Sequence, residues 1–147
     1  INLYGVDLKQ TCIDYAERNA PNPKIQFICD DYRNIQSHVA KIDVIHACLF
    51  CHHLNDEEII ALIQFALKNE SILVVNDLQR HWFAYYSIKI LTRVFSKSYL
   101  VKNDAPLSVL RGFKRNEWEQ ILAKSGASNY SIRYKWAFRY EVIVYAN

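Results

Sequence analysis

The stretch IDVIHACLF, residues 42–50, is apolar at nearly every position, and SILVVND, residues 71–77, repeats this pattern. A continuous apolar run of this length predicts a strand buried on both faces of a parallel sheet. Between the two runs, Asn55 and Glu58 have the spacing of a capping box, and apolar residues recur every three or four positions over residues 59–67. A strand, a helix and a second strand in this order predict a parallel β-α-β unit.

The same alternation extends in both directions along the chain. Periodicity predicts further strands at 2–7 and 25–29, helices at 9–19, 80–97 and 114–125, and two tightly joined antiparallel strands, YSIRYKW and FRYEVIVYA, at the end. Gly126 is expected to cap the helix before them. The predicted fold class is therefore α/β, a three-layer Rossmann-like sheet that is mostly parallel with an antiparallel C-terminal pair. We expect a single domain over 1–147, with residues 80–113 as a helical cap insertion.

Composition limits the protein class. The chain has 147 residues, of which 51% are hydrophobic and 14% aromatic, which is typical of a globular domain. It contains no apolar run of about 18 residues and no secretory signal, so we expect a cytoplasmic protein with reduced, buried cysteines. Residues 1–70 hold 6 Lys/Arg and 10 Asp/Glu, whereas residues 71–147 hold 12 and 5. This asymmetry indicates either two functional surfaces or unevenly charged solvated faces.

Ligands of open α/β sheets bind at the carboxyl ends of the strands. Asp7 ends the first predicted strand, where its carboxylate could accept both hydroxyls of a ribose or simply cap the next helix. Asp30 and Asp31 follow the second strand, where a carboxylate could accept from the amino group of adenine, with Tyr32 beside the ring, or belong to a solvated turn. Cys48 to His53 and the pair at 76–77 end the next two strands.

The segment CLFCHH, residues 48–53, has the spacing of a haem attachment site and also suggests zinc. Covalent haem attachment requires secretion, which nothing indicates, and the further histidines His46 and His81 do not have zinc-finger spacing. The segment therefore predicts residues lining a cleft and no metal. His52 and His53 are expected to point apart, so that one faces the cleft as a general base and the other faces solvent.

Several segments together resemble a known family. They are LYGVDLKQTCIDYAERN, IQFICDDYRNI, KIDVIHACLFCHHLNDEEI and SILVVNDLQRH, and they resemble a class I S-adenosylmethionine-dependent methyltransferase from its second strand onward. The late segment NDAPLSVLRGFKRNEWEQILAKSG looks like the small-molecule branch that includes quinone- and polyketide-modifying enzymes. The resemblance implies S-adenosylmethionine as the cofactor. It also implies that Asp7 binds the ribose, Leu8 packs on adenine, Asp31 or Asp30 contacts the adenine amino group, and Cys48 lines the cleft.

The resemblance does not include the family's first strand and its glycine-rich loop. The three glycines, Gly5, Gly112 and Gly126, do not lie in such a loop. We therefore expect a sheet whose first strand is missing, in a chain that is either truncated or continued upstream.

The segment HWFAYYSIKILTRVF, residues 81–95, is aromatic and apolar nearly all round. It is interpreted as a lid over a hydrophobic substrate pocket, a homodimer interface, or a helix lying on a membrane surface. In the lid interpretation Trp82, Tyr85 and Tyr86 face the substrate. A stripe of basic residues then faces outward; it comprises Lys89, Arg93 and Lys97. No nucleic-acid partner is expected, because this stripe is not aligned with exposed stacking aromatics.

Asp104 and Arg111 are polar residues in a segment expected to form an apolar loop, where they contact the substrate or pair with each other. The predicted function is methyl transfer to a small lipophilic acceptor, phenolic or quinone-like, with His53 or His81 removing a proton. The alternative is a degenerate, non-catalytic homologue that acts as a binding or oligomerising module.

Overall fold

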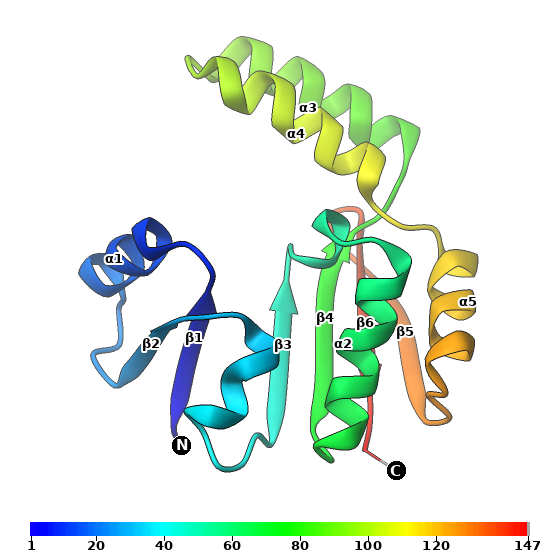
Figure 1. The fold of residues 1–147 in the computed structure, drawn as a ribbon. Coiled ribbons are helices and arrows are strands. Elements are labelled where there is room, and N and C mark those ends of the chain that lie inside the picture. The colour runs from blue at the N-terminus through cyan, green and yellow to red at the C-terminus, as the bar shows by residue number, and fades with distance from the viewer. Residues whose placement is uncertain (147) are drawn as a thin grey trace. The chain divides into compact units, whose positions relative to one another are not determined.

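The computed structural model describes residues 1–146, and the chain forms two compact units that divide between residues 41 and 42. The first unit is a two-stranded parallel sheet with one helix between its strands (Figure 1). Strand β1 (Leu3–Asp7) leads into helix α1 (Gln10–Asn19), and strand β2 (Ile25–Cys29) is followed by the short 3-10 helix η1 (Tyr32–Ser37). This order confirms the predicted strand–helix–strand unit.

The second unit is built on a four-stranded sheet in the order β3-β4-β6-β5. Its elements are β3 (Val44–Cys48), η2 (Cys51–His53), α2 (Asp56–Lys68), β4 (Ile72–Leu78), α3 (Trp82–Phe95), α4 (Tyr99–Arg111), α5 (Arg115–Ser125), β5 (Tyr130–Lys135) and β6 (Arg139–Val144). Strands β3 and β4 are parallel, whereas β6 runs antiparallel to both β4 and β5. The predicted α/β class with an antiparallel C-terminal pair is confirmed.

The core of the second unit lies on one face of this sheet. Alternate residues of β4 and β6 are buried, and helices α2 and α5 pack against each other and bury their apolar sides. The fully buried side chains include Leu73, Val75, Val142, Ile59, Ile63, Trp118 and Leu122. Because strand side chains alternate between faces, this single buried row is enough to fix the register of β4 against β6.

Burial of the two apolar runs differs from the expectation. Val44 is 55% exposed, and His46 and Cys48 on the same strand are also exposed. Strand β3 is an edge strand that pairs only with β4 among residues 1–146, which leaves one of its sides uncovered. In β4, buried and half-buried residues alternate. The prediction of strands buried on both faces was therefore wrong.

The cysteines also differ from the expectation of buried thiols. Only Cys51 is buried, whereas Cys12, Cys29 and Cys48 are exposed, and all four are free. Cys29 and Cys48 each end a strand, so their side chains lie at the rim of a sheet rather than beneath a helix. The apolar residues around Cys29 and Cys48 in the sequence predicted burial, whereas the positions of both residues at strand ends leave their side chains exposed.

Helix α4 replaces the loop that was expected after residue 98. Ser98 caps it by accepting from the backbone N–H of Val101, and the helix continues through Pro106. A proline inside a helix is unfavourable by about 3 kcal/mol, so helix propensity disfavours a helix in this segment. Packing of α4 against α3, with Pro106 and Val109 buried, outweighs that cost. No helix within residues 1–146, including these two, is long and apolar enough to cross a membrane.

The α3–α4 hairpin leaves and rejoins the second unit at one place (Figure 1). The N–H of Phe113 donates to the carbonyl of Leu78 at 2.9 Å, and the N–H of Arg80 donates to the carbonyl of Phe113 at 2.9 Å. A Cβ on Gly112 would lie 2.7 Å from the Leu78 carbonyl oxygen, so only glycine permits this approach. Arg80 also binds Glu117 of α5 through two hydrogen bonds, at 3.0 and 3.2 Å.

The capping box that the sequence predicted at the start of α2 can be tested by mutation. Asn55 accepts from the Glu58 N–H at 2.9 Å, and Glu58 accepts from the Asn55 N–H at 2.8 Å. We expect Asn55→Ala to lower the free energy of unfolding by about 1 kcal/mol, because a helix N–H loses its acceptor. Gln64→Ala, at an exposed position within α2, is the control and should change stability by less than about 0.5 kcal/mol in urea unfolding. Equal effects would contradict the capping role.

Candidate functional site

Asp7 and Asp30 lie at the same edge of the first unit. Asp7 is paired with Cys29 in the register of β1 and β2, and the N–H of Asp30 donates to the Asp7 carbonyl at 3.1 Å. Parallel strands place their carboxyl ends together, so the two acidic positions are neighbours despite a separation of more than twenty residues. The two strands end together, as the sequence predicted, whereas the expectation that the carboxylates of Asp7 and Asp31 face one shared cleft stays a prediction.

The carboxylate of Asp7 is exposed and only partly engaged. Its Oδ1 accepts from the backbone N–H of Lys9 at 2.8 Å, a local turn that leads into α1. Among residues 1–146 no other side-chain bond of Asp7 is present, so Oδ2 remains available to a ligand. Leu8, the next residue, is 71% exposed. An acceptor oxygen beside an uncovered apolar side chain suits a ligand that carries hydroxyls next to a flat ring.

Asp30 and Asp31 are held by neighbours of their own unit. Asp30 accepts from the N–H of Asp31 at 2.6 Å, from Asn34 at 3.0 Å and from Nε2 of His38 at 2.9 Å. These bonds, that of His38 first, lower the pKa of Asp30 below its ordinary value. Asp31 caps η1 and forms an ion pair with Arg33, which lowers the pKa of Asp31 in the same way.

These bonds bear on the adenine contact that the resemblance implies. The Arg33 guanidinium takes both oxygens of Asp31, so an amino group of a ligand would have to share one of them. Carboxylate oxygens accept more than one hydrogen bond, and Asp31 is only partly buried, so the contact is compatible with this arrangement. Tyr32, half-buried at the start of η1, follows directly.

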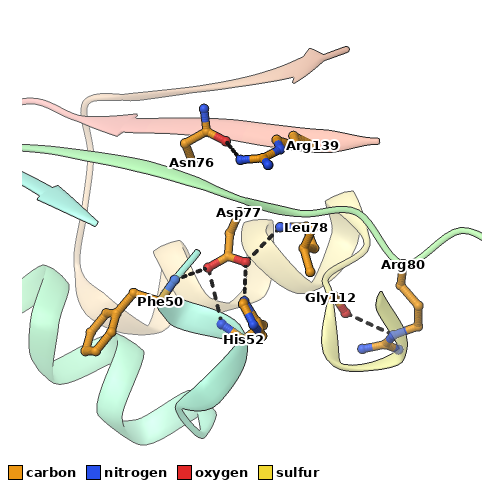
Figure 2. A network of polar contacts seen from close by, with 8 residues as sticks. All are labelled: Phe50, His52, Asn76, Asp77, Leu78, Arg80, Gly112 and Arg139. Atoms are coloured by element: carbon orange, nitrogen blue, oxygen red, sulfur yellow. Dashed lines mark hydrogen bonds and ion pairs between the residues drawn. The ribbon is translucent and has the colours of Figure 1, made fainter. Parts of the chain in front are cut away.

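A buried carboxylate organises the carboxyl end of β4 in the second unit. Figure 2 shows Asp77, which is fully buried, surrounded by N–H donors. Its Oδ1 accepts from Nδ1 of His52 and from the N–H of Leu78, both at 2.7 Å. Its Oδ2 accepts from the N–H groups of Phe50 at 3.1 Å and His52 at 3.3 Å. The loop after β3 is thereby fixed to β4 through one side chain.

The two adjacent histidines have different environments, but they do not point apart as predicted, because both lie on the 3-10 helix η2 rather than on extended chain. His52 is 6% exposed and bound to Asp77, whereas His53 is exposed, with its ring centroid 4.1 Å from that of His52. Cys51 beside them is buried, and burial, followed by the nearby Asp77 charge, raises the pKa of its thiol. Cys48 is exposed on β3. No group of three or more metal-ligating side chains exists within residues 1–146.

His81 begins the α3–α4 hairpin rather than standing alone at the strand end. It is the N-cap of α3, where Nδ1 accepts from the N–H of Phe83 at 3.2 Å. Its half-exposed ring stacks on Phe138, with centroids 5.0 Å apart, and beside Trp82 at 5.8 Å. Because Nδ1 accepts this bond, the imidazole hydrogen is on Nε2. His81 would have to change to its other tautomer before Nε2 could accept a proton from a ligand.

The aromatic residues of α3 do not all face the same way. Trp82 and Tyr86 are 69% and 57% exposed. Tyr85 instead lines a groove between α3 and α4 together with Lys89 and Arg93. Arg93 and Lys97 are exposed, as expected for the outward-facing basic stripe, whereas Lys89 is half-buried beside Tyr85.

Asp104 and Arg111 lie on α4, both exposed and outside this groove. They are seven residues apart on one helix, so their backbones are separated by roughly 10 Å. No ion pair joins them among residues 1–146. Of the two roles left open for them, pairing with each other is excluded, and a contact with substrate stays a prediction.

Sequence reasoning placed Asp77 at a strand end but missed its role. Its partners are the N–H groups of a loop about 25 residues away, which no local pattern reveals. It also missed the contact of Arg80 with Glu117 at the base of the α3–α4 hairpin. One signal was available for Asp77: a charged residue that continues the buried alternation of β4 needs polar partners.

Removal of the Asp77 carboxylate should be severe. Asp77→Ala leaves buried N–H groups without an acceptor, so we expect a loss of about 3 kcal/mol or more in the free energy of unfolding. Asp104→Ala, an exposed change on α4, is the matched control and should stay within about 0.5 kcal/mol. Urea unfolding followed by circular dichroism measures both. If the two variants lose the same stability, the Asp77 network does not hold the loop to β4.

The lowered pKa of Asp30 predicts a pH dependence. A carboxyl whose pKa is lower in the folded state stabilises the protein above its ordinary pKa, and this contribution is lost as the pH falls through the lowered value. His38→Ala removes the main cause, so the pKa of Asp30 should rise toward its ordinary value in a carbon-13 NMR titration. Ser37→Ala, next to His38 at the end of η1, should leave it unchanged, because the Ser37 hydroxyl donates to the Asn34 carbonyl and not to Asp30. An Asp30 pKa unaffected by His38→Ala would refute the assignment.

A family model described as a methyltransferase domain matches residues 1–69. No curated protein matches the chain.

Solved structures match the chain almost end to end. The plantazolicin methyltransferase BamL, in complex with a triazolic desmethylPZN analogue and SAH, has a TM-score of 0.65 at 16% identity; the match covers 100% of this chain and 69% of BamL. Human N-acetylserotonin methyltransferase in complex with SAM has a TM-score of 0.63 at 9% identity, covering 98% of this chain and 40% of that protein. PigF with SAH has a TM-score of 0.60 at 14% identity, covering 100% and 44%.

These similarities support the resemblance found in the sequence. Identities of 9–16% establish the fold, and the chain spans 40% of the human enzyme and 44% of PigF. Because the chain covers less than half of these two proteins, their activities are not assigned to it. Residues 1–69 match a methyltransferase domain, and the chain as a whole has the Rossmann-like fold of methyltransferases solved with SAM or SAH.

Proposed function

We propose that the protein is an S-adenosylmethionine-dependent methyltransferase that acts on a small lipophilic acceptor, phenolic or quinone-like. The observation that carries this proposal is the edge of the first unit, where Asp7 and Asp30 meet within the region that matches a methyltransferase domain. The solved relatives that contain SAM or SAH support the cofactor assignment.

The residues of this edge fit an adenosine. Asp7 offers a free carboxylate oxygen for the ribose hydroxyls, and the uncovered Leu8 offers an apolar surface to adenine. Asp31, or Asp30, accepts from the adenine amino group beside Tyr32. In the second unit, Cys48 is exposed at the end of β3. When bound, S-adenosylmethionine supplies a methyl group activated by its sulfonium.

The acceptor must lose a proton if it reacts through a hydroxyl. His53 is the better-placed candidate base, since it is exposed at the end of η2 and lies against His52, which Asp77 holds. His81 is the second candidate, at the start of the cap. Both residues belong to segments that follow the carboxyl end of a strand, where ligands of this fold class bind.

The α3–α4 hairpin is proposed as the cap over the acceptor. It leaves the sheet directly after β4, and its first turn carries the exposed Trp82 and Tyr86, which offer apolar area for an aromatic acceptor. Asp104 and Arg111 on α4 provide exposed polar groups for the same ligand. Closure of such a cap would exclude water during transfer. A homodimer contact and a peripheral membrane contact of this hairpin remain predictions.

Calorimetry with S-adenosylmethionine tests the proposal. Asp7→Ala should weaken binding by about 1.5–3 kcal/mol, because charge-assisted hydrogen bonds to the ribose are lost. Asp14→Ala, an exposed carboxylate on α1 of the same unit, is the matched control and should leave the affinity unchanged.

Each outcome has a distinct meaning. An unchanged affinity of Asp7→Ala would remove the ribose role of that residue. A folded chain that binds no S-adenosylmethionine would favour the second candidate, a non-catalytic homologue that binds or oligomerises. The exposed apolar side chains of the hairpin, including Ile90, Val94 and Phe95, are the observation that favours this candidate.

A further inference from the structure

A groove runs between α3 and α4 and is distinct from the strand ends described above. Its volume is about 540 Å³, within the range of small-molecule sites. Three cationic side chains line it: Lys89 and Arg93 come from α3, and Lys102 comes from α4. No carboxylate lines it. Residues 81–111 hold five Lys/Arg and a single acid, Asp104, which lies outside the groove.

The three cations have no anionic partner among the residues that the structure describes. No ion pair within residues 1–146 includes Lys89, Arg93 or Lys102. Lys89 is positioned by Tyr85, with its Nζ 5.4 Å from the centre of the ring, rather than by a carboxylate. Like charges around one concave surface repel each other and create a positive potential there. An anion in the groove would relieve this repulsion.

Apart from Asn103 and the two tyrosines Tyr85 and Tyr99, the rest of the lining is apolar. Leu107 and Leu110 contribute exposed side chains on α4, beside the buried Pro106. A fully hydrated inorganic anion would leave this surface unused, whereas an apolar body attached to the anionic group would cover it. An arginine guanidinium binds a carboxylate or phosphate through two parallel hydrogen bonds, and the two lysines add charge.

We propose that the α3–α4 groove binds a small amphipathic anion, a carboxylate or phosphate head carried on an apolar chain or ring. Arg93 and Lys102 hold the head from opposite helices, Lys89 adds charge beside Tyr85, and the leucines of α4 contact the apolar body. The inference does not rest on methyl transfer, since the site lies wholly within the hairpin and needs no cofactor.

Calorimetry with monomeric dodecanoate tests the head group, and dodecanol is the uncharged counterpart. Dodecanoate should bind at least about tenfold more tightly than dodecanol. The double variant Arg93→Gln with Lys102→Gln should weaken dodecanoate binding by at least about tenfold. The matched control is Lys97→Gln with Arg133→Gln, which removes the same charge at exposed positions outside the groove and should change the affinity less than about twofold. Thermal unfolding confirms that both variants fold.

Two results would overturn the proposal. Equal weakening in both double variants would mean that net charge alone attracts the anion, and equal binding of dodecanol would mean that the cations do not contribute. S-adenosylmethionine is absent from these samples, so neither result bears on the proposed methyl transfer.

Vesicles of phosphatidylglycerol and of phosphatidylcholine identify the source of the anion. If only the groove variant loses sedimentation with phosphatidylglycerol vesicles, and dodecanoate competes, the groove takes the head of a lipid. If vesicles have no effect on dodecanoate binding, the ligand is a free amphipathic anion. Vesicle binding that both double variants weaken equally, with no binding of monomeric dodecanoate, would identify a membrane-facing surface and refute the groove.

Discussion

The second unit depends on one buried carboxylate. Asp77 continues the inward-facing row of β4 at the position where an apolar residue would extend the core, and four hydrogen bonds satisfy it there (Figure 2). An unpaired buried charge would be very unfavourable, so the loop after β3 has to present its N–H groups to this residue. That requirement positions His52, and through it the exposed His53. The hydrogen bonds that the buried Asp77 carboxylate requires thus determine the position of His53, the candidate base.

The α3–α4 hairpin depends on a similar local constraint. Residues 78–80 pair with residues 112–113 through backbone hydrogen bonds. The absence of a side chain on Gly112 allows the two segments to approach this closely. Arg80 then ties the base to α5 through Glu117. The hairpin beyond this base carries many exposed apolar side chains and an excess of positive charge. Its attachment is therefore specific, whereas its outer surface is available for ligands.

Charge is used differently in the first unit. Asp30 and Asp31 stand side by side, and each is stabilised by a cation or donor within eight residues, His38 for one and Arg33 for the other. Asp7 differs from these two, because its Oδ2 has no partner among residues 1–146. Of the acidic residues at this edge, it is the one whose exposed oxygen is uncommitted. This difference makes Asp7 the most direct test of cofactor binding.

The sequence by itself determined the order of the elements, because periodicity and capping are local. The box at Asn55 and the left-handed Gly126, with φ of 81°, appear as predicted. It also placed Asp7 and Asp30 at one edge, since parallel strands align their ends. It did not determine α4, where tertiary packing overrides Pro106, or the exposure of β3, which follows from its edge position. The partners of Asp77 and the cationic groove of α3 and α4 were decided only by the tertiary structure, because both join residues whose proximity no local pattern encodes.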